Sequence, residues 1–445
     1  MLASFANMFR IPELRKKILF TLGVLIVYRL GCLLPVPGVN VNELQEIFRK
    51  QASSPVFGMM GLAALLSGGA LSRSTVFALG IMPYISATII FQLLTGVIPA
   101  LERLRKEGES GLKKIRQYER YTTFILCLFQ GLLYVQWLER ISATESAPII
   151  YSAWGTRLTA IIAMSTGTMV LMWLGDQITQ FGVGNGISLL IMAGIVSRLP
   201  AALWSLVTGI QTGNIGIGTI VFLLGAFVVI VAGVVLITQG QRRIPTQQAK
   251  HTRGRMVYGG QRQYLPFRVN HSGVMPVIFA STLLMFPQMI LQPLQSVWSA
   301  ANTVQNTWLG GGSWLYVTIY VLLIFFFSYF WTSIMFKPKD LADNLKDYGS
   351  FVPGIRPGRN TAEYLEYIMV RITLAGAAFL AVIAVVPQLL QAATNMGYTV
   401  TGFYGGTTIL IVVGVALDTV EKVESHLVMR HYEGFMRTGR IKGRR

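Results

Sequence analysis

Charged residues are scarce in this chain of 445 residues. Only 13% of them are Asp, Glu, Lys or Arg, whereas 53% are hydrophobic and the mean hydropathy is +0.54. A soluble globular protein carries about 25% charged residues. The composition therefore excludes an ordinary soluble protein of this length and predicts a membrane protein with several spans.

Cysteine and histidine are also scarce, with two and four residues respectively. Cys32 and Cys127 both lie inside apolar runs. This placement gives neither a disulfide framework nor a cluster of zinc ligands. We therefore expect no metal site and no cofactor.

Motifs that carry catalytic chemistry are missing as well. The sequence has no P-loop, no HExxH and no GxSxG string, and no pair of carboxylates within its apolar segments. We therefore predict that the chain is neither an enzyme nor an ATPase. Ion-coupled transporters usually place ionisable groups at mid-membrane, and such groups are rare here. A passive conduit with an apolar lining is the favoured function, and a secondary transporter for a small solute is the alternative.

Ten apolar segments are long enough to cross a bilayer, which takes about 20 residues of helix. They cover residues 18–35, 76–96, 121–138, 157–176, 186–207, 216–238, 273–292, 314–336, 366–387 and 403–420. Arg29 lies past the midpoint of the first segment, where an unpaired charge costs roughly 2.5 to 3.5 kcal/mol. Its side chain should therefore face protein or water.

Basic residues predict the orientation of these segments. The parts of the chain before the first segment, after the tenth, and between segments two and three, six and seven, and eight and nine hold 30 of the 38 Lys and Arg residues. Because such loops stay on the cytoplasmic side, both termini are predicted to be cytoplasmic. If residues 57–72 also crossed, the seven basic residues of 103–120 would face outward. Residues 57–72 are therefore expected to enter and return, which requires a surrounding cavity; a hairpin of two ordinary spans is the alternative.

The predicted spans divide into two equal sets. Residues 1–210 contain the first five, and residues 211–445 contain the other five together with a cytoplasmic tail. Because each set is odd in number, a structural repeat of the second half would be inverted relative to the first. Inverted repeats are common in transport proteins and place the pathway at their interface.

Two long loops are candidate docking surfaces. Residues 240–272 contain seven basic and no acidic residues, with Lys250, Arg253 and Arg255 in mid-loop. This composition fits either anchoring on anionic lipid or docking to RNA phosphate or an acidic protein. Residues 337–365 contain the string PGIRPG, whose prolines and glycines predict a rigid turn that presents Arg356.

Several strings, taken together, resemble the SecY family of protein-conducting channels from about Pro12 to Arg440. They are GGALSRSTVFALGIMPYISATIIFQLL, KKIRQYERY, GTMVLMWLGDQIT, GVGNGISLLI, GQRRIP, NHSGVMPVIFAS, FVPGIRPG and FYGGTTILIVV. The resemblance implies an all-α membrane protein of ten transmembrane helices in two inverted halves of five, with a re-entrant plug and an hourglass pore. It implies a passive conduit that passes secretory proteins across the membrane and releases transmembrane segments sideways into it.

The resemblance also assigns site residues. The plug is about residues 57–74, including Phe57, Gly61, Leu65, Gly68, Gly69 and Arg73. The pore ring is Ile81, Ile85, Ile187, Ile191, Ile278 and Ile411. The polar cluster of the lateral gate is Gln130 and Asn270 with Ser86 or Thr88, and the docking residues are Lys250, Arg253, Arg255 and Arg356. On residue pattern alone, an isoleucine pair at this spacing would more often be packing or lipid contact.

Partners and location are likewise implied by the resemblance. They are the small membrane subunits SecE and SecG, the motor ATPase SecA or the ribosome as the source of energy, and secretory or membrane proteins with signal sequences. Anionic lipid is a further expected contact. The expected location is the bacterial inner (plasma) membrane, with a thylakoid membrane as the alternative.

Overall fold

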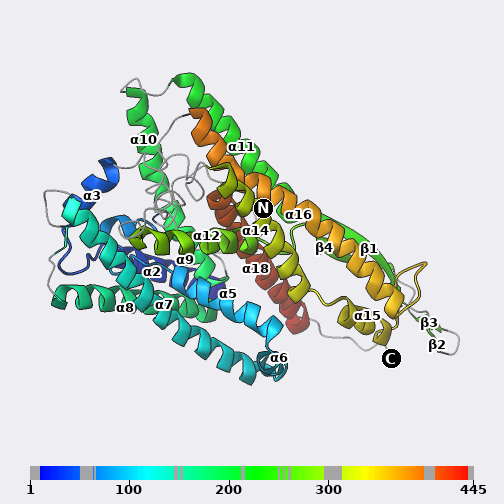
Figure 1. The fold of residues 1–445 in the computed structure, drawn as a ribbon. Coiled ribbons are helices and arrows are strands. Elements are labelled where there is room, and N and C mark those ends of the chain that lie inside the picture. Colours follow the sequence, from blue (N-terminus) through cyan, green and yellow to red (C-terminus); the bar gives the residue numbers. More distant parts are fainter. Residues whose placement is uncertain are drawn as a thin grey trace.

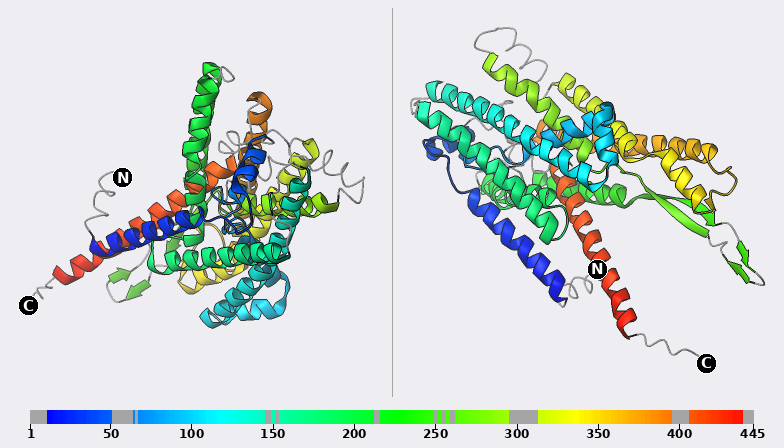
Figure 2. Two further views of the ribbon diagram at one scale, coloured as in Figure 1. Left: turned by 90° about the vertical axis from the view of Figure 1, so that its left-hand side faces the viewer. Right: turned by 90° about the horizontal axis from the view of Figure 1, so that it is seen from below.

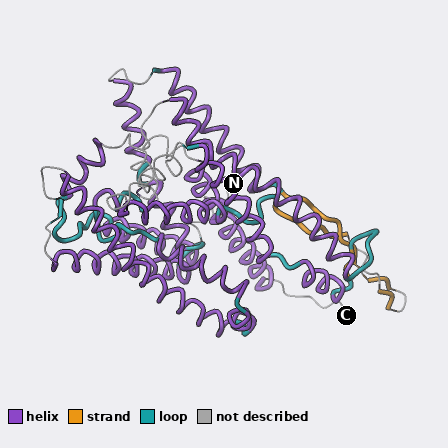
Figure 3. Tube along the Cα trace, in the orientation of Figure 1, coloured by secondary structure: helices purple, strands orange, loops and turns teal. Residues whose placement is uncertain are grey.

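The computed structural model describes most of the chain, and all structural statements below concern the described residues. These are residues 11–50, 64, 67–144, 149–150, 154–211, 216–248, 251–253, 256–258, 262–294, 313–394 and 406–438. Helices make up most of them, and strands occur only at one end of the described molecule (Figure 3).

The regular elements described in the first half of the chain are all helices (Figure 1). Its elements are α2 (Pro12–Gly31), α3 (Val41–Lys50), the 3-10 helix η1 (Leu71–Arg73), α5 (Met82–Val97), α6 (Pro99–Lys106), α7 (Glu109–Thr144), α8 (Trp154–Phe181), α9 (Gly186–Val196) and α10 (Leu199–Gln211).

The second half combines long helices with a small sheet. Its helices are α11 (Ile217–Gln239), α12 (Met275–Leu294), α14 (Trp314–Met335), α15 (Pro338–Asp347), α16 (Arg359–Thr394) and α18 (Gly406–Thr438). Its strands are β1 (Gln241–Gln248), β2 (His251–Arg253), β3 (Met256–Tyr258), β4 (Arg262–Arg268) and β5 (Ser350–Phe351).

Each of the ten predicted spans coincides with a helix or, at residues 186–207, with the pair α9 and α10. Six helical segments of the described chain are long and apolar enough to cross a membrane, and the bent pair α5 and α6 would make a seventh. The first, seventh and tenth predicted spans coincide with α2, α12 and α18. The fold is therefore a mostly helical, multi-span bundle.

The second predicted span begins later than its sequence pattern suggested. Residues 75–81 form turns, and helix α5 starts only at Met82. Gly80 has a φ of +60°, which a continuing α-helix does not allow, and Pro83 lies in the first helical turn, where a missing N–H costs nothing. At the other end Pro99 begins a new helix, α6, bent by 99° from α5.

The basic loop 240–272 forms strands, which the sequence reasoning did not predict. Strand β1 pairs antiparallel with β4, from Gln241 opposite Arg268 to Gln247 opposite Arg262, and β5 adds to the far end of β1. Ile244 of β1 and Phe267 of β4 are buried against Leu365 and neighbouring residues of α16. The two long loops are therefore one packed unit, held by an apolar cluster.

Polar elements gather at one end of the bundle. Helices α6 and α15 and the strands lie towards the lower right of Figure 1, whereas α3 lies at the upper left. Helices α2 and α18 lie beside one another, and their residues Leu14 and Val423 share an apolar cluster with Val183 (Figure 2). The end that carries the sheet is called the basic end below, and the end that carries α3 is called the plug end.

Candidate pore, plug and docking surfaces

One apolar cluster contains all six isoleucines of the predicted pore ring. Those at positions 81, 191 and 411 are buried, and those at positions 85, 187 and 278 pack against the cluster partly buried. They come from α5 and the residue before it, α9, α12 and α18, and so from both halves of the chain. The structure thus gathers residues that are up to 330 positions apart, counted from Ile81 to Ile411.

The two isoleucines of the second span keep their expected spacing although the helix starts late. Ile81 precedes the first turn of α5, and the Ile85 N–H donates to the Ile81 carbonyl at 3.1 Å. This bond continues the helical pattern by one residue. The two side chains therefore approach the cluster from the same side, as residues four apart on a helix do.

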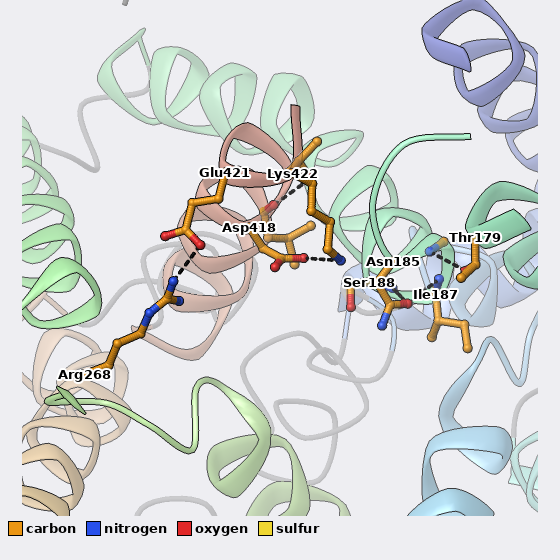
Figure 4. Close-up of polar contacts among 11 residues, drawn as sticks. Thr179, Asn185, Ile187, Ser188, Arg268, Asp418, Glu421 and Lys422 are labelled. Atoms are coloured by element: carbon orange, nitrogen blue, oxygen red, sulfur yellow. Dashed lines mark hydrogen bonds and ion pairs between the residues drawn. The ribbon is translucent and has the colours of Figure 1, made fainter. Parts of the chain in front are cut away.

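The start of α9 is fixed by side-chain hydrogen bonds, drawn in Figure 4. The Asn185 Oδ1 accepts from the backbone N–H of Ile187 at 3.1 Å and of Ser188 at 3.5 Å. The Thr179 hydroxyl accepts from the Gly186 N–H at 2.9 Å. These bonds satisfy orphan donors of the first turn, and they hold Ile187 at the cluster.

The predicted plug lies only partly within the described residues. Phe57, Gly61 and Leu65 lie outside them. Gly68 and Gly69 form a turn with φ of +64° and +88°, values that favour glycine. A Cβ on Gly68 would lie 3.0 Å from the Gly194 Cα of α9, so the turn packs directly against the α9 backbone.

Three hydrogen bonds hold the turn and η1 to the surrounding helices. Arg29 Nη1 of α2 donates to the Gly68 carbonyl at 3.4 Å, and it also donates to the Ser197 hydroxyl at 2.8 Å. Arg198 Nη2 donates to the Ser72 hydroxyl at 2.7 Å. The Tyr134 hydroxyl of α7 donates to the carbonyl of Leu71 at 2.9 Å. The Arg29 side chain is exposed, but its guanidinium bonds to protein groups, in line with the expectation of protein or water around it.

Arg73 and Arg198 complete this region. Arg73 ends η1, and its side chain is exposed. Arg198, which follows α9, was not singled out from the sequence. Its one signal was a single charge within the otherwise apolar segment 186–207, and nothing in the pattern placed it beside the predicted plug.

The polar residues of the predicted lateral gate lie near the seam between the halves, where α12 contacts α5 and α7. Gln130 and Asn270 are buried. The Ser86 hydroxyl donates to the carbonyl of Met82 in its own helix. Within the described chain no hydrogen bond joins these four side chains, so their role as a gate stays a prediction.

Ion pairs connect elements at the basic end (Figure 4). Arg268 of β4 pairs with Glu421 of α18 at 2.7 Å, and Lys422 pairs with Asp418 one turn earlier at 2.9 Å. Nearby, the Gly184 backbone approaches Thr419 of α18. The base of the hairpin is therefore tied to the same helix that carries Ile411.

The predicted docking residues are only partly described. Lys250 and Arg255 lie outside the described residues, and Arg253 is described as backbone only, paired with Met256 across β2 and β3. Arg356 is exposed on the expected turn, between two glycines with positive φ. The Thr361 hydroxyl donates to the Arg356 carbonyl at 2.9 Å, which fixes the turn.

Comparison with known proteins gives matches along nearly the whole chain. The SecY family model matches residues 75–420. The protein translocase subunit SecY of Streptomyces scabiei is 45% identical over 444 residues, covering 98% of this chain and 100% of that protein.

Two solved structures share the fold at low sequence identity. One is a SecY protein whose plug domain stabilises the closed state of the translocation channel, with a TM-score of 0.63, 18% identity and coverage of 93% of this chain and 92% of that one. Another is the Sec61 channel of a canine ribosome–channel complex from the endoplasmic reticulum, with a TM-score of 0.60, 17% identity and 93% coverage of both chains.

Proposed function

The chain belongs to the SecY family, and we propose that it is the central channel subunit of a Sec translocon. It conducts secretory proteins across the membrane and releases transmembrane segments into the lipid. The observation that carries this assignment is the apolar cluster in which the six isoleucines of the predicted pore ring meet, from both halves of the chain. The matches give no support to the alternative, a secondary transporter for a small solute.

The isoleucine cluster is the proposed constriction of the pore. Branched apolar side chains around a narrow passage resist wetting, as hydrophobic gates do. They can also contact any polypeptide loosely, because they impose no hydrogen-bond pattern on it. In this proposal the turn at Gly68 and Gly69 belongs to a plug that seals one side of the constriction, as the related SecY plug does for its channel.

The seam where α12 contacts α5 and α7 is the proposed lateral exit. Buried amide and hydroxyl groups lie near it, and hydrogen bonds between helices in membranes contribute only about 0.6 kcal/mol on average. A seam closed so weakly can open when a signal sequence offers its own apolar helix. Gln130, Asn270, Ser86 and Thr88 are the residues proposed to set this threshold.

Partners must supply the energy of transport in this proposal, because the sequence contains no nucleotide-binding motif. We assign this task to the motor ATPase SecA or to the ribosome, with SecE and SecG as small membrane subunits. The docking surface is the basic hairpin with Lys250, Arg253 and Arg255, together with Arg356. The canine relative forms a complex with a ribosome, which supports this choice.

The proposed location is the bacterial inner (plasma) membrane with both termini in the cytoplasm; a thylakoid membrane is the alternative. The orientation is supported by charge, because α6, the hairpin, α15 and the end of α18 all belong to the basic end. Positive residues favour the cytoplasmic side.

Reconstitution tests the proposed function. The chain is placed in vesicles with SecE, SecG and SecA, and a secretory precursor with or without its signal sequence is added with ATP. We expect protection of the signal-bearing precursor from external protease, and no protection without the signal. Ion-dependent uptake of a small solute without precursor export would instead support the transporter alternative.

A further inference from the structure

Within the described residues, the arginines that contact the plug turn donate to neutral acceptors. Arg29 contacts the Gly68 carbonyl and the Ser197 hydroxyl, and Arg198 contacts the Ser72 hydroxyl. A Cβ on Gly69 would lie 2.1 Å from Arg198 Nη2, so the guanidinium lies directly against the turn. The glycine turn is therefore contacted by two guanidinium groups, one from α2 and one from the residue region that follows α9.

The same region gathers three positive charges, and no carboxylate among the described residues forms an ion pair with them. Arg198 contacts Ser72, which is next in the chain to Arg73, and Arg29 contacts Gly68 in the same turn, so three like charges surround one turn. Arg198 is also half-buried, where repulsion is screened less than in bulk water.

Two opposing forces therefore act on one turn. Hydrogen bonds from charged donors are stronger than neutral ones and favour the docked turn. Like charges at short range oppose it, and one of those charges, Arg73, belongs to the plug itself. Separation of the plug from α2 and α9 would relieve the repulsion.

We propose that Arg29 and Arg198 are positioning residues that latch the plug, and that Arg73 is a built-in opposing charge that keeps the latch releasable. This inference rests on the proposed function, because it requires the turn to be part of a channel plug. It assigns opposite effects to residues of the same type around one turn. A role in packing alone would not produce that sign difference.

The test uses the full chain reconstituted with SecE and SecG in vesicles that contain radiolabelled sucrose. A neutral probe is chosen so that arginine charges near the pore do not attract or repel it. Basal sucrose efflux reports the closed state, and SecA-driven export of a precursor reports opening. The variants are Arg198→Gln, Ser72→Ala, Arg73→Gln and Arg73→Glu, with Lys106→Gln on α6 as a matched loss of positive charge far from the plug.

Loss of the latch and loss of the opposing charge should move efflux in opposite directions. We expect Arg198→Gln to raise basal efflux about tenfold, as loss of one charge-assisted hydrogen bond predicts, and Ser72→Ala to raise it to a lesser extent. Arg73→Gln should lower efflux and slow export several-fold, and Arg73→Glu should do so more strongly because a carboxylate would pair with the guanidinium groups. Lys106→Gln should behave as the unmodified chain.

The salt dependence of efflux distinguishes an effect of charge repulsion from an effect of packing. The Debye length falls from about 10 Å at 0.1 M to about 3 Å at 1 M salt. The difference between the unmodified chain and Arg73→Gln should therefore shrink at high salt, whereas the efflux of Arg198→Gln should stay raised. Arg198→Lys, which keeps the charge and one donor, should restore part of the seal.

Two results would contradict the proposed latch. If Arg73→Gln raised efflux, Arg73 would be an anchor and not an opposing charge. Unchanged efflux in both Arg198→Gln and Ser72→Ala would remove the latch itself. Failure of the unmodified chain to export a precursor would instead count against the proposed function, so the two failures are distinguishable.

Discussion

Arginines beside the plug turn and arginines at the basic end are held in different ways. Arg29 and Arg198, beside the plug turn, donate to hydroxyl and carbonyl oxygens. At the basic end, Arg268 pairs with the carboxylate of Glu421, and Arg359 pairs with that of Glu363. The isoleucine cluster is built from apolar side chains and includes Ala70 of the plug turn.

This difference indicates which contacts are meant to separate. A guanidinium that donates to a neutral oxygen keeps its net charge and repels other arginines nearby. The hydrogen bond that it makes is therefore opposed by this repulsion. A guanidinium on a carboxylate is neutralised, and the elements it joins have no electrostatic reason to part. The plug turn is therefore suited to release, whereas the basic end is suited to give a partner a fixed surface.

The largest expected effect comes from a polar substitution in the isoleucine cluster. Ile411→Asn places an amide at a buried position, 4% exposed, within the proposed ring. Water should then enter the constriction and join the two ends, so basal ion conductance of reconstituted channels should rise more than tenfold.

Ile409 is the matched control for this change, because it lies on the same helix and is also 4% exposed, but it belongs to a different apolar cluster, whose buried members include none of the six ring isoleucines. Ile409→Asn should destabilise the fold to a similar extent without a comparable rise in conductance. Equal conductance in the two variants would remove Ile411 from the ring.

A second change compares one glycine from each end. Gly69 and Gly354 have nearly the same φ, +88° and +86°, but a Cβ on Gly69 would collide with Arg198, whereas a Cβ on Gly354 would meet nothing within 4 Å. Both alanine variants carry backbone strain of order 1 kcal/mol. Only Gly69→Ala should raise basal sucrose efflux, by several-fold. If Gly354→Ala raised efflux equally, strain and not the latch would explain the result.

A third change probes the fixed surface of the basic end. Arg356→Glu reverses an exposed charge on the turn held by Thr361 and should weaken binding of SecA or of ribosomes several-fold, measured by co-sedimentation with vesicles. Arg359→Glu reverses a nearby exposed charge whose partner lies on its own helix, and it should have less effect. Equal loss in both would indicate a general attraction to the basic end and not recognition of Arg356.

The smallest effect is expected at the Arg268–Glu421 pair. Both side chains are about half exposed, and exposed pairs contribute only about 0.2 to 1 kcal/mol. A double-mutant cycle with Arg268→Ala and Glu421→Ala, read out by thermal unfolding in detergent, should give a coupling energy in that range. A coupling near zero would mean that the hairpin is held to the rest of the chain by the apolar cluster at Ile244 alone.

Features that depend on a single segment of the chain could be predicted from the sequence. All ten apolar segments coincide with helices, because length and hydropathy are properties of a single segment. The rigid turn at Arg356 was also predictable, since its prolines and glycines act locally. The resemblance to the SecY family supplied the six isoleucines, which no periodicity distinguishes from lipid-facing residues.

Features that depend on distant contacts could not be predicted in this way. Ile244 and Phe267 are buried because α16 covers the hairpin that carries them. The composition of this loop alone is that of a solvated basic segment. The proposed role of Arg198 depends on its contact with Ser72, which is 126 positions away in the chain. Most of the predicted plug, including Phe57, Gly61 and Leu65, lies outside the described residues and stays a prediction.

The most direct test of the central claim is a map of the path taken by a translocating chain. A photo-crosslinking amino acid is placed at position 85, 278 or 411 in the cluster, or at position 228 on α11, where Val228 is 65% exposed. A precursor is then arrested in transit through the reconstituted channel. The account predicts crosslinks to the arrested chain from the three cluster positions and none from position 228. Crosslinks from position 228 without any from the cluster would contradict it.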